Sequence, residues 1–162
     1  MESTQAILTA LENTPYLILP LAREVPPALR KRRPAARKWS VHEHVCHLAA
    51  VHPLFFARLE QMLRQENPRI APYFPEDMGE DGYLLKVDFE EALERFVRER
   101  RKLLERLNLL SDQDWQRTAV HQEYRHYSVF IMFRHLALHD LFHSYRIEEL
   151  RLKKDWEEAP AS

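Results

Sequence analysis

Nine histidines in 162 residues make imidazole the most conspicuous chemical group of this sequence, and six of them fall in two segments. The six are His42, His44 and His47 in the first segment and His135, His139 and His143 in the second. His139 and His143 are four residues apart, so on a helix both imidazoles project from one face, about one turn apart. Two imidazoles at this spacing can bind one divalent metal ion.

A third ligand has to come from another element, since catalytic metal sites commonly use three protein ligands. We expect His47, because it lies in the apolar middle of its segment rather than at a polar end. His135 lies one turn before His139, but helical twist rotates it off the shared face, so it is the weaker candidate. Glu43 could be a fourth ligand, a base or only the partner of a helix cap. No catalytic residue is assigned.

The remaining five histidines are expected at the surface or in loops: His42, His44, His52, His121 and His126. A bland alternative is that His139 and His143 are packing residues of the core, and for an isolated pair we would favour it. Several imidazoles among Phe, Leu and Met side chains would each need a hydrogen-bond partner, however, and one shared metal supplies them jointly. We therefore expect one divalent ion, with zinc favoured and nickel or iron as alternatives.

Two further residues near these histidines could do chemistry. The segment from His139 to His143 is similar to the H-E-x-x-H helix of zinc peptidases, with Asp140 in place of the glutamate base. Asp is one methylene shorter, so we expect Asp140 to accept a hydrogen bond behind the site or to lie on the surface. Cys46 points away from His47 around a helix and is expected to be a small buried residue.

The histidines need helices to position them, and long segments free of glycine and proline predict four. The first covers about Thr4–Arg23, in two pieces because Pro15 and Pro20 each remove a backbone donor. The second opens at Ser40, where a capping box with Glu43 marks the start. It runs to the Asn-Pro pair at 67–68, with a bend at its internal proline.

The other two helices are predicted over Asp88–Asn108, with its Arg and Glu residues facing solvent, and over Ser128–Lys153. Between them lies a short turn at Ser111–Trp115. The segment Pro68–Val87 has no period and reads as a long loop of the kind that often forms a lid or binding loop. A four-helix bundle forming one all-α domain over residues 1–162 is the expected fold.

Composition excludes several classes of function. Two glycines, Gly79 and Gly82, leave no Gly-rich loop for nucleotide phosphates. One cysteine and no signal-peptide pattern favour the cytoplasm. The longest uncharged stretch, 45–57, is too short for a bilayer, which needs about 20 apolar residues. The net charge is −1, and the basic run Arg30–Lys38 lacks interleaved aromatics, so we expect a solvated linker there and no nucleic-acid partner.

Several motifs occur in a characteristic order: Trp39-Ser40, Glu43, His47-Leu48, the stretch 112–117 around Trp115, and His139–His143 with Ile147. This order resembles the DinB/YfiT-like superfamily of helical bundles over nearly the whole chain, from Ile7 to Leu152. The resemblance implies a four-helix bundle with a three-His metal site and, in many members, a homodimer. The chain departs from the family at Arg146, where a Gln is common, and at Arg125-His126, where a Gly often precedes the last helix. Neither departure touches a ligand position.

The resemblance also implies a class of activity, because members include thiol-dependent transferases and presumed hydrolases. A metal-dependent enzyme of one of these types would act on a small-molecule substrate or use a low-molecular-weight thiol. Three neutral imidazoles leave a coordination position open for either. Two alternatives stay open: a metal-binding or stress-response protein without turnover, which a fourth protein ligand would favour, and a helical interaction module that binds no metal. Arg146 could bring a positive charge toward a bound anion.

Overall fold

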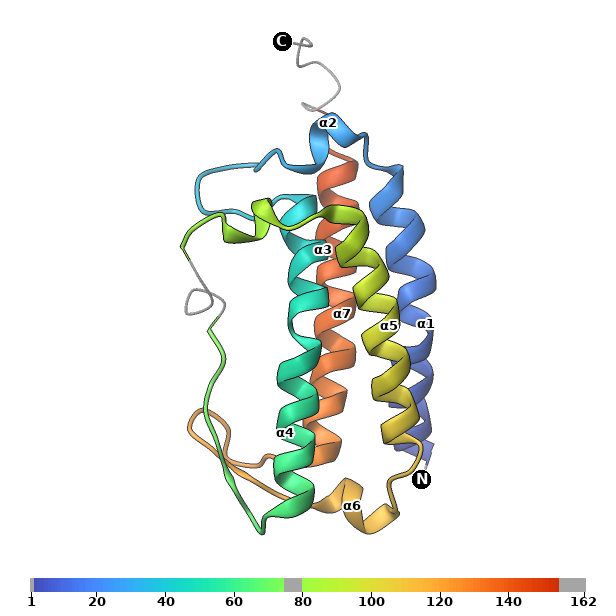
Figure 1. Cartoon of the computed structure of the whole chain (residues 1–162), viewed down its shortest axis with the longest axis vertical. Coiled ribbons are helices and arrows are strands. Elements are labelled where there is room, and N and C mark those ends of the chain that lie inside the picture. The colour runs from blue at the N-terminus through green and yellow to red at the C-terminus, as the bar shows by residue number, and fades with distance from the viewer. Residues whose placement is uncertain (1, 75–79, 155–162) are drawn as a thin grey trace.

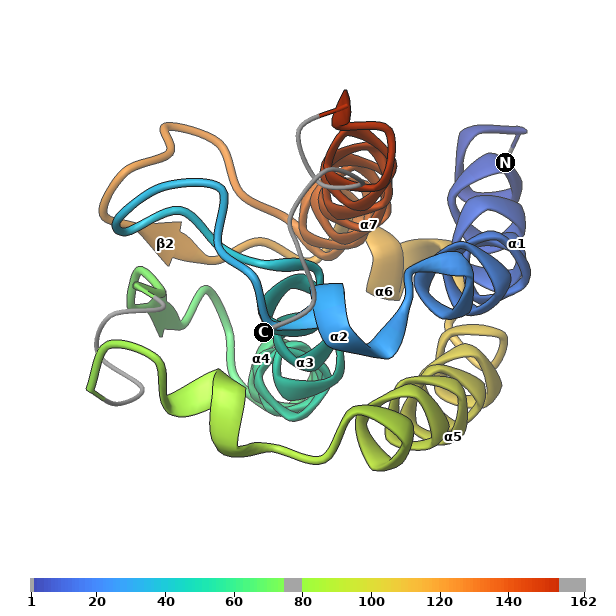
Figure 2. The same cartoon turned by 90° about the horizontal axis from the view of Figure 1, so that it is seen from above.

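The computed structural model describes residues 2–74 and 80–154, and in them four long helical columns lie side by side (Figures 1 and 2). The columns are α1 (Glu2–Glu24), the consecutive helices α3 (Val41–Ala50) and α4 (His52–Arg64), α5 (Phe89–Leu107) and α7 (Val129–Arg151). The shorter elements are α2 (Pro27–Arg30), α6 (Asp112–Gln116), the 3-10 helix η2 (Tyr83–Lys86) and the strands β1 (Arg69–Ile70) and β2 (Val120–His121). The predicted all-α four-helix bundle is confirmed.

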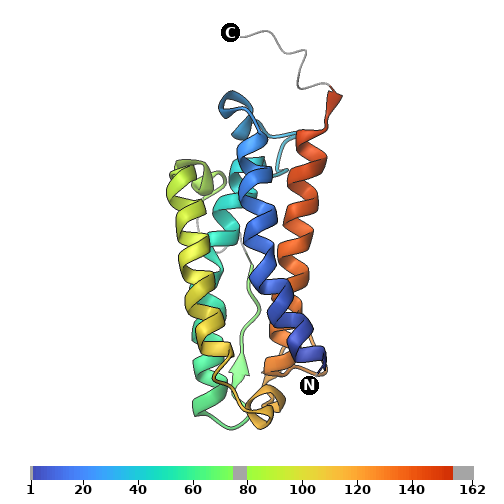
Figure 3. The ribbon, with the colours of Figure 1, turned by 90° about the vertical axis from the view of Figure 1, so that its right-hand side faces the viewer.

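The directions in which the helices run explain why the connection between α4 and α5 is long. α1 and α7 run one way along the bundle axis, while α3–α4 and α5 run the other way (Figures 1 and 3). Because α4 and α5 are parallel, the chain between them has to return along the whole bundle. The long loop predicted at 68–87 is confirmed in its described part, which also carries β1 and η2. β1 pairs in parallel with β2, in the register Arg69 with Val120 and Ile70 with His121.

α1 is one continuous helix, so the prediction of two pieces is wrong. Pro15 is partly buried and Pro20 is exposed, and both are accommodated inside the helix. An internal proline costs a helix about 3 kcal/mol. Burial of large apolar side chains such as Leu11 and Ile18 contributes about 1.5–3 kcal/mol each. The packing of α1 against α5 and α7 therefore outweighs the local preference.

The helix that carries His47 starts where the sequence predicts. The Ser40 hydroxyl accepts from the backbone N–H of Glu43, and the Glu43 carboxylate accepts from the backbone N–H of Ser40 at 2.9 Å. The predicted bend is a break at Val51, with Pro53 in the first turn of α4. Side-chain caps also begin α5 and α7, and both helices start and end within two residues of the predicted positions.

Two clusters of buried apolar side chains fill the bundle, one toward each end. A layer of buried polar groups separates them: Thr14, His52, Arg100 and Asp140. Arg100 is only 1% exposed, so the prediction that the arginines of α5 face solvent is wrong at this position. No described helix is both long and apolar enough to cross a membrane.

Candidate metal centre

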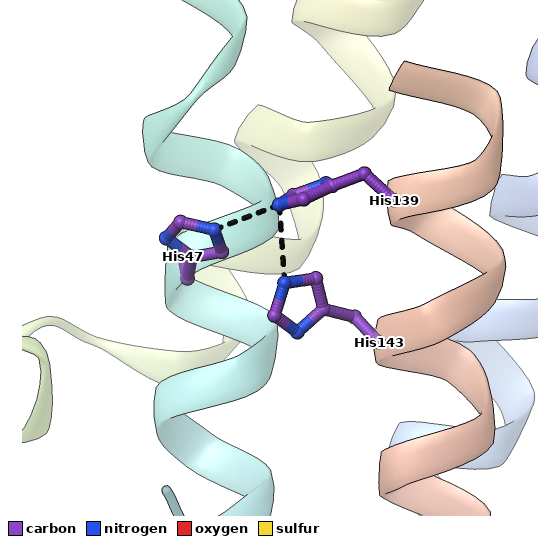
Figure 4. A group of neighbouring side chains, drawn as sticks. All are labelled: His47, His139 and His143. Carbon is purple, nitrogen blue, oxygen red and sulfur yellow. Dashed lines mark hydrogen bonds between the residues drawn. The ribbon is translucent and has the colours of Figure 1, made fainter. Parts of the chain in front are cut away.

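Three imidazoles from two facing helices converge in the space between those helices (Figure 4). His47 comes from α3, and His139 and His143 come from adjacent turns of α7. The Nε2 atom of His139 lies 2.9 Å from Nε2 of His47 and 3.1 Å from Nε2 of His143. One ligand atom from each residue lies within 4.8 Å of the other two. The structure thus brings together the three residues that the sequence predicts as ligands.

These contacts cannot both be hydrogen bonds between neutral imidazoles. Each ring nitrogen of a neutral imidazole carries either one proton or one lone pair, so Nε2 of His139 can satisfy only one of its two neighbours. A cation that accepts a lone pair from every ring satisfies all three. Nitrogens around a tetrahedral zinc ion lie about 3.3 Å apart, given Zn–N bonds of about 2.0–2.1 Å. The two separations from His139, 2.9 and 3.1 Å, are close to this value, so the donor set fits such an ion.

Burial keeps His47 and His143 in the neutral form that a metal requires. Desolvation lowers the pKa of His47 to about 3, with further lowering from the nearby His139 and His44. Desolvation also lowers the pKa of His143, again assisted by its neighbouring histidines. The lone pairs are consequently available at neutral pH.

Aromatic rings enclose the cluster. The Trp39 ring stacks on His143 with a centroid separation of 5.8 Å, and it lies 4.7 Å from the ring of His47. Tyr73 lies in the connection between α4 and α5, and its ring stacks on the ring of His47 with a centroid separation of 6.1 Å. Solvent reaches the cluster at His139, whose side chain is 26% exposed.

A fourth histidine belongs to this site and was missed. His44 was expected at the surface, but it is buried and its Nδ1 lies 2.7 Å from Nδ1 of His143. Desolvation lowers the pKa of His44 to about 4, assisted by the positive charge of Arg146. The spacing of His44 and His47, three residues apart on one helix, places both on the same face and was the signal that could have found it.

Comparisons with known proteins agree with this arrangement. The sequence model of the DinB superfamily matches residues 10–145. This chain belongs to the DinB superfamily. A curated relative from Oceanobacillus iheyensis, whose name assigns it provisionally to the metal-dependent hydrolases, is 31% identical over 119 residues, covering 73% of this chain and 68% of the relative.

Solved structures show the same fold. YfiT from Bacillus subtilis, described as a probable metal-dependent hydrolase with an unusual four-helix bundle topology, matches this DinB-superfamily chain with a TM-score of 0.86 at 21% identity. That match covers 96% of this chain and 90% of YfiT. The colibactin self-resistance protein ClbS, solved in complex with double-stranded DNA, matches with a TM-score of 0.64 at 16% identity, covering 98% of this chain and 97% of ClbS.

Glu43 of this DinB-superfamily chain is engaged outside the three-His cluster. Besides its capping contacts with Ser40, its carboxylate accepts from the guanidinium of Arg33, which also bonds Asp81 at 2.8 Å. Burial would raise the pKa of Glu43, but the hydrogen bonds from Arg33 and Ser40 outweigh it and lower the pKa. Of the three roles considered, the capping role is confirmed. The prediction of a solvated linker is therefore wrong at Arg33, whose side chain is fixed by Glu43 and Asp81.

Asp140 is buried and faces the polar layer, so the surface alternative is wrong. Its Oδ2 accepts from Arg100 at 2.6 Å and from Thr14 at 3.1 Å. Its Oδ1 lies 3.9 Å from Nδ1 of His139, too far for a hydrogen bond. Cys46 is buried as predicted, and desolvation raises the pKa of its thiol to about 12, so it is no nucleophile at neutral pH.

The remaining histidines divide by burial. His42, His52 and His121 are buried, so the expectation that they lie at the surface is wrong for them, although His121 does lie outside the long helices. His126 is exposed, as predicted. His135 is exposed and lies outside the three-His group, with its ring against Tyr124.

Proposed function

We propose that this DinB-superfamily chain is a metal-dependent enzyme, of hydrolase or thiol S-transferase type, that holds one divalent ion with His47, His139 and His143. The observation that carries the proposal is the convergence of three imidazole nitrogens, two of them from buried residues, that cannot satisfy one another by hydrogen bonding. Zinc is the favoured ion, with nickel or iron as alternatives, because imidazole suits all of them. The provisional name of the Oceanobacillus iheyensis relative supports the same class of reaction.

The ligand set leaves room for chemistry. In the described part of the chain, no carboxylate, thiol or fourth imidazole joins the three-His group as a ligand. An ion with three protein ligands and an open position supplies a Lewis acid, whereas a structural zinc site is normally closed by four protein ligands. This count favours an enzyme over a metal-binding protein without turnover.

The residues around the histidine cluster determine where a substrate can approach it and which type of nucleophile suits it. His139 is the exposed edge of the cluster, so a small-molecule substrate or a low-molecular-weight thiol would approach there, beside the ring of Tyr73. Both nearby carboxylates are already held, Glu43 by Arg33 and Asp140 by Arg100. The site therefore suits a nucleophile that needs no carboxylate base, such as a thiolate, and no catalytic base is assigned.

A small-molecule partner is also favoured over nucleic acid. Two arginines of the basic run are engaged within the chain, Arg30 with Glu90 at 3.6 Å and Arg33 with Glu43 and Asp81. The DNA bound in the ClbS structure is a property of that protein, at 16% identity to this chain. A gel-shift assay with double-stranded DNA at physiological salt is expected to show no complex; a stable complex would restore nucleic acid as a partner.

The first test is metal content. Elemental analysis of untagged protein is expected to find about one equivalent of divalent metal in the wild type and none in His139→Ala. His135→Ala is the matched control, since it removes an exposed imidazole one turn earlier on α7, and it is expected to keep the metal. No metal in the wild type would overturn the proposal and favour an interaction module.

The second test asks whether a coordination position is open. Cobalt(II)-loaded protein is titrated with 2-mercaptoethanol as the probe thiol, and the expected result is a new near-ultraviolet charge-transfer band. A cobalt spectrum that does not respond to the thiol or to azide would indicate a closed site, and so a metal-binding protein without turnover.

A further inference from the structure

The outer nitrogen of each candidate ligand has a different environment. Nδ1 of His143 lies 2.7 Å from Nδ1 of His44, a short hydrogen bond between two buried rings. Nδ1 of His139 has its nearest carboxylate oxygen 3.9 Å away, and Nδ1 of His47 is buried without a hydrogen-bond partner in the described part of the chain. Among the described residues, His143 is therefore the one candidate ligand whose Nδ1 is hydrogen-bonded to another side chain.

The positions of the protons follow from this contact. If His143 binds a metal through Nε2 as a neutral imidazole, its proton is on Nδ1. That N–H can only donate toward Nδ1 of His44, which must then present a lone pair and carry its own proton on Nε2. The contact thus selects one tautomer of each ring, and it is the tautomer of His143 that leaves Nε2 free to bind the ion.

Packing holds the pair in place. The Trp39 ring lies edge-on to the His44 ring at 5.5 Å and stacks nearly parallel on the His143 ring, with an angle of 18° between the planes. His44 itself lies in the first turns of α3, whose start is fixed by the capping box at Ser40. Neither ring can turn away without disturbing its contact with Trp39.

We propose that His44 is a positioning residue of the metal centre, which orients His143 and fixes its tautomer through the Nδ1 to Nδ1 hydrogen bond. This inference rests on the proposed function, because it concerns the same ion. It adds a fourth histidine to the site without making it a ligand. Hydrogen-bond partners behind a ligand typically contribute about 10–100-fold to metal affinity.

The experiment measures zinc affinity by competition with a chromophoric chelator for the full-length protein. His44→Leu keeps an apolar volume near that of imidazole but has no acceptor, and it is expected to bind zinc about 10–100-fold more weakly than the wild type. His44→Asn places an amide oxygen where Nδ1 was, and it is expected to restore most of the affinity. The cobalt(II) absorption spectrum should change in His44→Leu and return toward the wild-type shape in His44→Asn.

His42→Leu is the matched control. His42 is buried on the same helix, but its Nε2 bonds the carbonyl oxygen of Val87 at 2.9 Å rather than a candidate ligand. It is expected to keep the wild-type zinc affinity. If the wild type binds zinc and His44→Leu binds it equally well, or if His42→Leu loses as much affinity as His44→Leu, the positioning role is overturned. If the wild type binds no zinc, the proposed function fails as well.

Discussion

Two buried polar clusters lie next to each other on α7, and they solve the problem of burial in opposite ways. In the polar layer, Arg100 donates to Asp140 at 2.6 Å, to Thr14 at 2.9 Å and to a backbone carbonyl at 2.8 Å. In the histidine cluster, one residue away along α7, three imidazoles converge with too few protons to satisfy one another. The first cluster pairs opposite charges within the chain, whereas the second contains a group of bases that the proposed metal ion would satisfy.

The two clusters also differ in the charges that surround their titratable groups. Burial would raise the pKa of Asp140, but the charge of Arg100 outweighs it and holds the pKa below its ordinary value, so the carboxylate stays ionised. In the histidine cluster, burial lowers the pKa of His47, and the nearby His139 and His44 lower it further, against a smaller opposing effect of Asp140. Opposite charges hold the polar layer together, while a group of neutral bases offers lone pairs to a cation.

The largest expected effect is a loss of folding stability when the ion pair of the polar layer is broken. Arg100→Met leaves the buried Asp140 carboxylate without its counter-charge, and we expect a loss of about 3–5 kcal/mol in the free energy of unfolding. Asp140→Ala should cost a similar amount, because it leaves the guanidinium unpaired. The measurement is urea unfolding of metal-free protein at pH 7.

The double variant Arg100→Met, Asp140→Ala provides the control for this pair. Because it removes both charges together, it should lose less stability than the sum of the two single variants. Strictly additive losses would mean that the two groups do not interact, and the polar layer would then not be held by this ion pair.

A smaller effect is expected in the histidine cluster, and only when metal is present. His47→Leu removes a buried imidazole with an unpartnered Nδ1, so the metal-free protein should unfold at the same urea concentration as the wild type or a higher one. Zinc at a free concentration of 100 times the dissociation constant should stabilise the wild type by about 2.7 kcal/mol and leave His47→Leu unchanged. His135→Leu, an exposed position, should respond to zinc as the wild type does. Stabilisation of His47→Leu by zinc would remove α3 from the proposed site.

The sequence predicts most of the histidine cluster because its members follow local rules. The spacing of His139 and His143 needs only a helix, and the position of His47 in an apolar stretch needs only that the helix face inward. His44 was expected at the surface because it lies near the polar start of α3, although it is on the same helix face as His47. The contact that gives it a role joins residues 99 positions apart, and no local pattern contains it.

The polar layer was not predicted, for a related reason. Arg100 is on the apolar face of α5 between Phe96 and Leu103, but an arginine in a charged helix is usually exposed. Its burial depends on Asp140 arriving from α7, and that requires the bundle to be assembled. α1 shows the same limit, since its prolines are tolerated only because packing on α5 and α7 holds the helix together. Capped helix ends, by contrast, were predicted closely because a cap is a local structure.

The last expected effect concerns the histidine of the polar layer and is spread over several pH units. His52 accepts from Nε of Arg100 at 3.0 Å through its Nε2, and a protonated ring could not accept this bond. Burial lowers the pKa of His52 to about 3, assisted by the charge of Arg100, from an ordinary value of 6.5. Between these values the unfolded chain binds a proton that the folded chain does not, so stability is full above pH 6.5 and falls as the pH drops toward 3. The contribution of His52 is at most about 1.4 kcal/mol per pH unit.

His52→Gln tests this contribution, because its amide oxygen can still accept from Arg100 but does not titrate. Urea unfolding of metal-free protein between pH 7 and pH 4.5 should show the variant losing stability less steeply than the wild type, while the two differ little at pH 7. His126→Gln, at an exposed loop position, should follow the wild-type curve. Parallel curves for His52→Gln and the wild type would mean that His52 has the same pKa in the folded and unfolded chains, and its burial would then make no contribution to acid sensitivity.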